Sequence, residues 1–426
     1  MLIIAFILFF VFLLLGVPIA FSLGLGSVIA IFTSNQISPM LIASKLFSSI
    51  DSFSLMAIPF FMLSGELMEA GGISRRLVNI AKVFVGHITG GIGMVDIGTS
   101  VLFAGVSGSA AADTAAVGSM LIPSMIREGY PKGLAAVIQA CAGSLGPIIP
   151  PSLTMIIYCS LTGLSIGEMF MAGVIPGLII ALGIAIVTYF YAKKLKIKGA
   201  KRATTKETLQ ALKEGVLAII MPVIIIGGIV SGIFTPTESG AIAVVYALIV
   251  GMFVYKEFTL KDLPNVFLKG ASMTGMALLI VAGASIFSWL VAYEKIPSII
   301  ITFLMSLTNS RYIIMILLVL FLLFVGMFIE TLSATIICAP ILMPVAAQYG
   351  IAPIQFALIM VITLVYAGVT PPVGGVLFIT MGIAKAKMRD VLKYLPPYLG
   401  IVCIIIILLI FMPQLSLWLP KFLFKG

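Results

Sequence analysis

Long, uninterrupted runs of apolar residues restrict the fold of this chain more than any other feature. A helix needs about 20 apolar residues to cross a bilayer. Twelve apolar runs, bounded by charges or turn residues, lie at 2–15, 18–33, 53–70, 96–126, 131–163, 166–192, 217–234, 237–255, 272–292, 312–346, 352–384 and 398–417. The chain lacks the alternation of apolar and polar residues over about ten positions that a membrane β-barrel needs. With 9% charged residues, against about 25% in soluble proteins, most of its exterior must face hydrocarbon. The sequence therefore predicts an all-α, polytopic membrane protein.

Two runs are too long for one crossing and are interrupted near their middle. The run 96–126 contains Gly105-Val-Ser-Gly-Ser109, and the run 312–346 contains Gly326 and Glu330. Each interruption predicts a re-entrant hairpin, which enters and leaves the membrane on the same side. Two further long runs are counted as single crossings by broken helices, at 131–163 and 352–384.

The basic residues predict the orientation. With the N-terminus outside, only five of the 25 Lys and Arg residues fall on the outer side: Lys45, Lys295, Arg311, Lys421 and Lys425. The other 20 fall on the cytoplasmic side, as the positive-inside rule requires. We therefore expect an N-out, C-out topology. The segment 74–88 alternates basic and apolar residues with helical spacing and is predicted to lie along the cytoplasmic interface.

The chain repeats itself with an offset of 221 residues. The shift places Gly105 on Gly326, Thr114 on Thr335, Pro123 on Pro344, Gly129 on Gly350, Pro150 and Pro151 on Pro371 and Pro372, and Pro176 on Pro397. Five crossings separate equivalent points, so the second copy is upside down relative to the first. We expect inverted halves at 1–192 and 217–426, joined by a basic cytoplasmic linker at 193–216 that forms a solvated loop. Inverted repeats with paired broken segments indicate a secondary transporter whose site lies near the membrane midplane.

The interruptions carry groups that suit a small cation and an anion. Residues 105–113 offer flexible backbone and two hydroxyls, and three prolines within 144–152 leave carbonyl oxygens without helical N–H partners. The second copy offers related groups at 326–333 and 367–375. Hydroxyls and free carbonyls suit Na⁺, and the N-termini of the half-helices that follow the breaks favour an anion. These features predict an anionic solute that is transported with sodium.

Ionisable groups inside apolar runs are costly and are functional candidates by default. Asp113 and Glu330 lie beside the hairpin breaks and are candidate ion or substrate residues, with the nearby hydroxyls of Ser152 and Ser333 as further substrate candidates. The alternative for the break serines is that they satisfy backbone groups in a re-entrant loop. Three other acids are expected to be structural: Asp96 and Glu66 as solvated or capping groups near cytoplasmic helix ends, and Glu238 as a cap of the helix that begins near Thr237.

Other classes of function lack residues that they need. Gly105-Val-Ser107-Gly108 matches the GxSG of intramembrane serine proteases, but the one histidine, His87, lies in the interfacial segment. There is no HExxH zinc motif and no Gly-Lys dipeptide for a P-loop, so an enzyme is not expected. The basic residues behind the net charge of +10 are scattered, so no nucleic-acid partner is expected. A channel is an alternative, but paired inverted hairpins fit alternating access better.

These motifs resemble those of the large membrane subunit of tripartite ATP-independent periplasmic (TRAP) transporters. The matching segments extend over nearly the whole chain: GELMEAGGISRR at 65–76, VSGSAAAD at 106–113, GPIIPPS at 146–152, TPTESG at 235–240 and PILMP at 340–344. The resemblance implies an ion-transporter-superfamily fold in the bacterial inner (cytoplasmic) membrane, with a transport domain that moves like an elevator against a scaffold. It also implies at least two sodium sites, one carried over onto Ser107, Gly108, Ser109 and Gly146, the other onto Gly326, Thr331 and Thr370.

The resemblance further implies two protein partners, a small four-helix membrane subunit and a periplasmic substrate-binding protein that delivers the substrate. Substrates of the family are mostly carboxylates, including C4-dicarboxylates, sialic acid and other sugar acids, and the chain looks most similar to the sialic-acid branch. The alternative is a stand-alone, ion-coupled organic-anion transporter of the same superfamily that needs no binding protein. The sequence of one subunit leaves both open.

Overall fold

The computed structural model describes residues 1–34 and 37–424, and these residues form helices and no strand. The first half contains α1 (Leu2–Leu14), α2 (Ile19–Ser34), α3 (Met40–Ile50), α4 (Ala57–Ala70), α5 (Ile73–Val85), α6 (Ile92–Ser107), α7 (Ala110–Arg127), α8 (Lys132–Gly143), α9 (Leu153–Thr162) and α10 (Ile166–Lys194). The second half contains α11 (Thr205–Val230), α12 (Pro236–Ile249), α13 (Leu263–Tyr293), α14 (Ile296–Leu307), α15 (Arg311–Gly326), α16 (Thr331–Gln348), α17 (Pro353–Ala367), α18 (Gly375–Ala384), α19 (Met388–Leu392), α20 (Leu395–Phe411) and α21 (Gln414–Phe424). The all-α prediction is confirmed.

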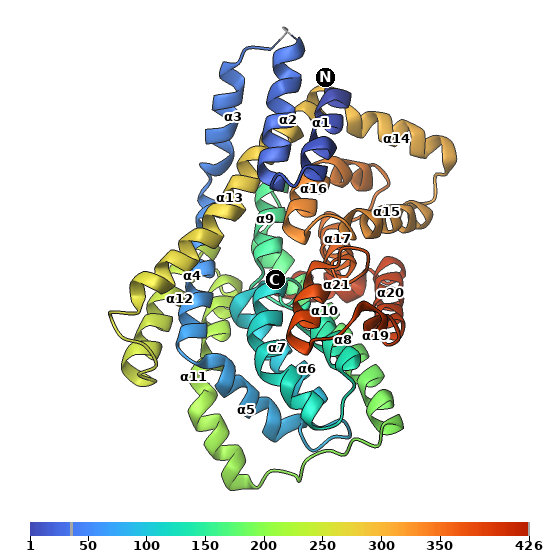
Figure 1. Cartoon of the computed structure of the whole chain (residues 1–426). Helices are drawn as coiled ribbons and strands as arrows, with labels where there is room; N and C mark the ends of the chain where they lie inside the picture. Colours follow the sequence, from blue (N-terminus) through green and yellow to red (C-terminus); the bar gives the residue numbers. More distant parts are fainter. Residues whose placement is uncertain (35–36, 425–426) are drawn as a thin grey trace.

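The helices are those of a multi-pass membrane protein. Among the described residues, six helices are long and apolar enough to cross a membrane, and a seventh span results if α20 and α21, bent by 59°, count as one. Large apolar side chains are exposed along many helices, as expected of a surface that faces lipid. Helix α13 runs obliquely beside α2, α3 and α4 (Figure 1).

The long runs are split where the sequence predicts interruptions. Residues 108–109 separate α6 from α7, and residues 327–330 separate α15 from α16. Residues 144–152 separate α8 from α9, and residues 368–374 separate α17 from α18. The second arm of each hairpin packs on a broken helix of the other half, α7 on α18 and α16 on α9. In Figure 1 the pair α6–α7 lies in the lower part of the molecule and α15–α16 in the upper part. This packing brings the four breaks into one region.

Helix α3 lies outside the apolar runs that the sequence analysis used. It contains Lys45 and three serines, which interrupt the apolar pattern, and only Ile42 of its side chains is fully buried. It nevertheless packs on α13. A short 3₁₀ turn at Phe53–Met56 follows α3 and leads into α4, and Phe53–Ala70 is long and apolar enough to cross a membrane, as the run 53–70 predicts.

The linker between the halves is more helical than predicted. Only residues 195–204 of the predicted linker lie outside helices, because α11 already begins at Thr205. A capping box begins α11: the backbone N–H of Glu207 donates to Thr204 Oγ1 at 3.3 Å, and that of Thr204 donates to Glu207 Oε2 at 2.7 Å. A polar helix start of this kind has no apolar periodicity to reveal it. Thr235 and Glu238 form the same box at the start of α12, which confirms the capping role expected for Glu238.

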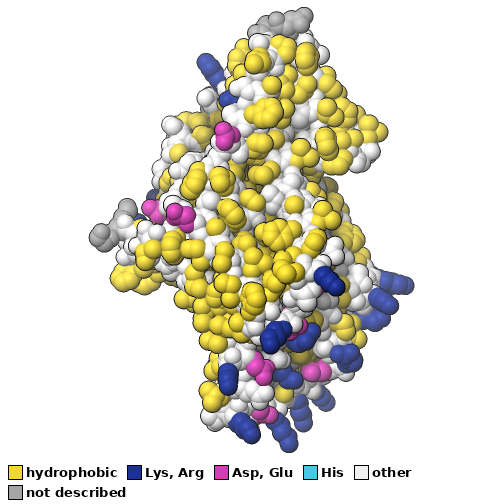
Figure 2. Space-filling model, turned by 90° about the vertical axis from the view of Figure 1, so that its left-hand side faces the viewer, with side chains coloured by type: hydrophobic (Ala, Val, Ile, Leu, Met, Phe, Trp, Pro, Cys, Tyr) yellow, Lys and Arg dark blue, Asp and Glu magenta, His cyan; other side chains and the backbone are white. Residues whose placement is uncertain are grey.

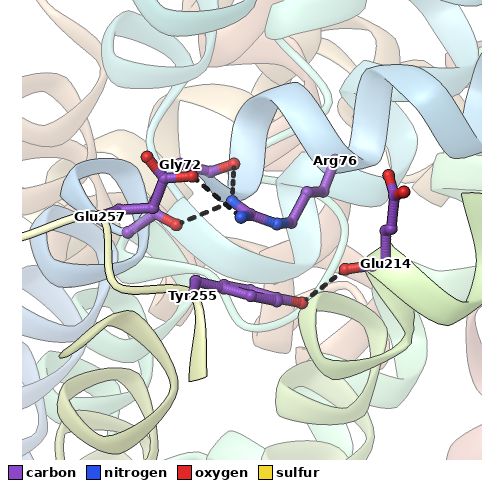
Figure 3. A network of polar contacts seen from close by, with 6 residues as sticks. Gly72, Arg76, Glu214, Tyr255 and Glu257 are labelled. Atoms are coloured by element: carbon purple, nitrogen blue, oxygen red, sulfur yellow. Dashed lines mark hydrogen bonds and ion pairs between the residues drawn. The ribbon is translucent and has the colours of Figure 1, made fainter. Parts of the chain in front are cut away.

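Helix α5 follows α4 closely, and its first turn is fixed to the second half of the chain. The Arg76 guanidinium donates to the carbonyl of Gly72 at 2.9 Å and to Glu257 Oε1 at 2.9 Å (Figure 3). It lies 3.6 Å from the centre of the Tyr255 ring, whose hydroxyl donates to the backbone carbonyl of Glu214 at 2.9 Å. These contacts join α5 to α11 and to the segment between α12 and α13.

Candidate functional site

The four breaks surround a cavity of about 380 Å³. Both halves of the chain contribute to its wall, through residues 108–111, Pro147, 153–154, 326–332, Gly368 and 373–376, together with Ile19 of α2 and Ile379 of α18. Helices α7, α9, α16 and α18 all begin at this wall. The first N–H groups of a helix lack intrahelical partners and carry partial positive charge. Four such helix ends therefore face one small space.

Charged side chains are scarce at this cavity. Glu330 is the only charged residue among the described residues of the wall, which include no Lys, Arg or His. No group of three or more His, Cys, Asp and Glu side chains that could hold a metal ion occurs in the described part of the chain. The available polar groups are hydroxyls, carboxyl oxygens and backbone groups, which are the oxygen ligands that hard cations prefer.

The turn of the first hairpin packs closely on the first broken helix. Gly108 has φ of +64°, and a Cβ there would lie 3.2 Å from Cα of Ser152, so this close approach requires glycine. Ser109 caps α7, because its Oγ accepts a hydrogen bond from the backbone N–H of Ala112 at 3.5 Å. Both predicted sodium residues of this turn, Gly108 and Ser109, line the cavity.

Asp113 lies in the first turn of α7 and is completely buried. The hydroxyl of Ser107 donates a hydrogen bond to Asp113 Oδ1, whereas Oδ2 has no partner among the described residues. Gly146 packs directly against this carboxyl group and leaves no room for a side chain. The structure thus brings the predicted residues Ser107, Asp113 and Gly146 together beside the cavity wall, with one buried carboxyl oxygen that has no hydrogen-bond partner among the described residues.

Asp96 is neither solvated nor a helix cap, so its predicted role was wrong. It is fully buried in α6 beside the Gln139 amide of α8. With its nitrogen turned toward Asp96, that amide donates to the two carboxyl oxygens at 3.0 and 2.5 Å. In this orientation the amide oxygen is the atom that lies 3.4 Å from the backbone carbonyl of Asp113, so no hydrogen bond joins these two acceptors. Gln139 therefore ties α8 to α6 through Asp96. Glu66, by contrast, is partly exposed.

Ser152 has a local role and does not line the cavity. Its hydroxyl donates to the carbonyl of Pro147 at 2.6 Å and accepts from the backbone N–H of Met155 at 3.2 Å, which caps α9. This matches the alternative that a break serine satisfies backbone groups. Thr154, which the sequence analysis did not single out, lines the cavity instead. Thr154 lies in the first turn of α9, two residues after the capping Ser152. This place at the start of a half-helix is the sequence signal that could have identified it.

The second hairpin turn carries Glu330 at the N-cap of α16. Its carboxylate accepts from the backbone N–H groups of Leu332 at 3.1 Å and Ser333 at 3.3 Å, and the side chain is exposed at the cavity wall. The hydroxyl of Thr331 also lies at the wall and donates to the carbonyl of Leu364 in α17 at 3.5 Å. Gly326 packs tightly, since a Cβ there would lie 2.6 Å from Cβ of Ala367.

Two predicted residues lie next to the cavity without lining it. Ser333 is buried one turn into α16, and the hydroxyl of Thr370 donates to the carbonyl of Tyr366 at 2.9 Å. The hydroxyl of Tyr366 in turn donates to the carbonyl of Cys141 at 3.1 Å, across the two halves of the chain. This bond joins the last turn of α8 to the last turn of α17, so the two broken helices meet beside their breaks.

Comparisons with known proteins agree with one another. The family model for the DctM component of the tripartite ATP-independent periplasmic transporter matches residues 6–415. The C4-dicarboxylate TRAP transporter large permease protein DctM of Rhodobacter capsulatus is 38% identical over 424 residues, which cover 96% of each chain. The sialic acid TRAP transporter large permease protein SiaM of Vibrio cholerae is 36% identical over 411 residues, again 96% of each.

Two further similarities extend this comparison. The isethionate TRAP transporter permease protein DctMQ of Oleidesulfovibrio alaskensis is 38% identical over 411 residues, which cover 96% of this chain and 65% of that protein. A crystal structure of the YdaH transporter of Alcanivorax borkumensis matches 88% of both chains with a TM-score of 0.63. Its sequence identity is 13%, so this likeness concerns the fold alone.

Proposed function

Because the chain belongs to the DctM family of large permease subunits of TRAP transporters, we propose that it carries a small organic acid across the membrane together with sodium. The observation that supports sodium coupling best is the charge of the cavity. Its described wall contains one acid and no basic side chain. An anionic substrate there needs positive charge, which four helix N-termini supply only in part. Bound Na⁺ would supply the remainder.

The first sodium ion would bind behind the first hairpin turn. Asp113 Oδ2 is buried without a partner among the described residues, and at Gly146 only backbone atoms pack against it. A buried carboxylate without a partner is costly, and a cation bound to it would remove that cost. The second ion would bind at the second turn, where Gly326, Thr331 and the break before α18 meet. Thr370 lies within that break and would contribute its hydroxyl oxygen.

The substrate would be a small organic acid. Three relatives are named for a C4-dicarboxylate, sialic acid and isethionate. These molecules share a carboxylate or sulfonate group on a small polar body, and they differ in almost everything else. We assign that shared anionic group to the helix ends at the cavity wall, near Ser109 and Thr331. The carboxylate of Glu330 is occupied with capping α16 and would repel a second anion, so it would orient the substrate rather than bind its charge.

The transport domain would move like an elevator against the scaffold. The protein would lie in the inner membrane, with both termini on the outer side. The hairpins and broken helices pack on one another across the two halves, α7 on α18 and α16 on α9, as parts of one moving body would. Helices α2, α4, α12 and α13 pack together as a second group and would form the scaffold, with α13 packed on α16 of the moving body. The partners would be a small membrane subunit and a periplasmic substrate-binding protein. The DctMQ relative is longer than this chain, which covers 65% of it, as expected if two membrane subunits are fused there.

The test is uptake into proteoliposomes that contain this chain and its small membrane partner. Labelled sialic acid and a labelled C4-dicarboxylate are supplied with and without an inward sodium gradient, and with and without the binding protein. Uptake that needs both supports the tripartite sodium-coupled importer. Uptake with sodium alone would favour a stand-alone transporter, and uptake indifferent to sodium would overturn the coupling.

Two variants locate the ions. Ser107→Ala and Thr331→Ala should raise the sodium concentration needed for half-maximal uptake several-fold while leaving expression unchanged. The matched controls are Ser119→Ala in the same hairpin and Thr302→Ala in α14, where each hydroxyl donates only to a backbone carbonyl of its own helix, both at 2.9 Å. Wild-type sodium dependence in Ser107→Ala and Thr331→Ala would refute these site assignments.

A further inference from the structure

A second hollow lies far from the transport cavity, between α5 and the start of α11. Its volume is about 550 Å³, and its wall consists of Val83, Phe84, His87, Arg202, Ala203, Thr205, Thr208, Leu209 and Leu212. We call it the α5–α11 groove. Its floor and sides are mostly apolar, and Phe84 and Leu209 are 52% and 68% exposed. Nothing in the transport function requires large apolar side chains to be exposed at this place.

The charge at the groove is positive. Arg202 and His87 are the titratable residues of its wall, which contains no acidic residue among those described. Arg202 makes no hydrogen bond or ion pair with the described residues. The chain from 193 to 213 carries eight Lys and Arg residues and one acid, Glu207. Figure 2 shows Lys and Arg side chains gathered at this lower end of the molecule, while the middle of the same face is mainly hydrophobic.

The start of α11 adds a second positive group. Thr204 caps this 26-residue helix, and its capping box satisfies the backbone N–H groups of Thr204 and Glu207. The N–H groups of Thr205 and Lys206 precede the first intrahelical bond, and Thr205 lies in the wall of the groove together with Arg202. A phosphate there would meet a guanidinium and a helix N-terminus together, the usual partners of an oxyanion.

We propose that the α5–α11 groove binds an anionic phospholipid of the adjacent leaflet. The phosphate lies between Arg202 and the first turn of α11, and an acyl chain covers Phe84, Leu209 and Leu212. The charge pattern explains the preference for an anionic headgroup. The exposed apolar floor explains why a lipid fits the groove better than a free phosphate, which would leave these side chains in water. The lipid would hold the linker between the two halves against α5.

Thermal unfolding of the full chain in a neutral detergent tests this proposal. Phosphatidylglycerol is expected to raise the apparent melting temperature of the wild type more than phosphatidylcholine at the same concentration does. Arg202→Gln should abolish that difference. Arg389→Gln, which removes the same charge from an exposed residue of α19, should retain it. Inorganic phosphate alone is expected to have no such effect.

The apolar floor is tested separately. Leu209→Gln should reduce the stabilisation by phosphatidylglycerol, whereas Leu268→Gln, at a residue that is 69% exposed on α13, should not. This pair keeps the proposal testable if Arg202→Gln fails to fold. If phosphatidylglycerol stabilises all variants equally, the groove is not the binding site. If Arg202→Gln and Arg389→Gln lose the same amount of stabilisation, the effect is one of general surface charge, and the proposed site is refuted. Stabilisation by inorganic phosphate would show that the groove binds phosphate alone, and it would overturn the proposal of a lipid site. Since no step depends on uptake, failure of the transport proposal leaves this test intact.

Discussion

The buried hydroxyl of Tyr366 donates a hydrogen bond to the backbone carbonyl of Cys141 at 3.1 Å. The two residues are 225 positions apart, close to the 221-residue offset of the sequence repeat. Cys141 lies in the last turn of α8, where helix carbonyls lack their usual N–H partners. Tyr366 therefore satisfies a carbonyl that the first break exposes. The bond also couples the two broken helices, whose breaks both contribute to the cavity wall.

Tyr366→Phe tests this coupling, because it keeps the ring and removes only the donor. We expect a loss of about 1 kcal/mol in the free energy of unfolding, or more if the carbonyl stays buried without a partner, and slower uptake. The measurements are thermal unfolding in detergent and initial uptake rates. Tyr349→Phe is the control, since the hydroxyl of Tyr349 makes a longer, 3.4 Å bond to Thr308 at a partly buried position. Equal effects of the two variants would contradict a special role for Tyr366.

Gly146→Ala tests the space beside Asp113. The added methyl group would collide with the Asp113 carboxyl group, which is held from the other side by Ser107. We expect about 1–3 kcal/mol of destabilisation from overpacking and a large loss of sodium-dependent uptake. Gly382→Ala in α18 is the control, because a Cβ at Gly382 meets no atom within 4 Å. Normal sodium dependence in Gly146→Ala would exclude this space as an ion site.

Asp96 offers a test that separates hydrogen bonding from charge. Asp96→Asn keeps a polar group of the same size against the Gln139 amide, so we expect a folded protein with nearly normal uptake. Asp96→Ala leaves that buried amide without its partner, which costs about 1–3 kcal/mol. It should also raise the sodium concentration for half-maximal uptake, since α8, which carries Gln139, packs on α7, which carries Asp113. If Asp96→Asn is as defective as Asp96→Ala, the negative charge itself is required.

The sequence predicted the helices and their breaks better than the roles of single polar residues. Proline and glycine disrupt helices locally, so the interruptions at 105–109 and 144–152 were visible in the chain itself. Both hairpin turns meet around one cavity, whose wall includes Gly108, Ser109, Gly326 and Thr331, and the roles of these residues in binding sodium stay a prediction. Helix α3 and the first turns of α11 were missed because their polar residues hide the apolar pattern on which the prediction relied.

Contacts that the apolar pattern of the sequence does not reveal explain the remaining errors. Asp96 was expected near solvent because it lies close to the start of a helix, but Gln139, 43 positions later in the sequence, encloses it. Ser152 could be a ligand or a cap from its sequence alone. In the structure it caps α9, since its hydroxyl donates to the Pro147 carbonyl and accepts from the Met155 N–H. Side-chain roles at a break thus depend on which backbone groups the break leaves unpaired.

The contact between Arg76 and Glu257 in Figure 3 yields the last prediction. Arg76 uses its planar guanidinium in three ways at once: as a donor to Gly72, as an ion-pair partner of Glu257 at 2.9 Å, and as a cation over the Tyr255 ring. Lysine keeps the positive charge, but it lacks the planar guanidinium that donates several hydrogen bonds at once and stacks on an aromatic ring. Arg76→Lys should therefore lower the free energy of unfolding by about 1 kcal/mol.

A double-mutant cycle with Glu257→Gln isolates the ion pair. Both side chains are partly exposed, at 18% and 28%, so we expect a coupling energy of only about 0.5–1 kcal/mol. The effect of Arg76→Lys should exceed that coupling, because the contacts with Gly72 and Tyr255 are lost as well. Tyr255→Leu, which removes the ring, should make Arg76→Lys less harmful. Strictly additive effects of all three substitutions would show that these contacts do not hold α5 to the second half.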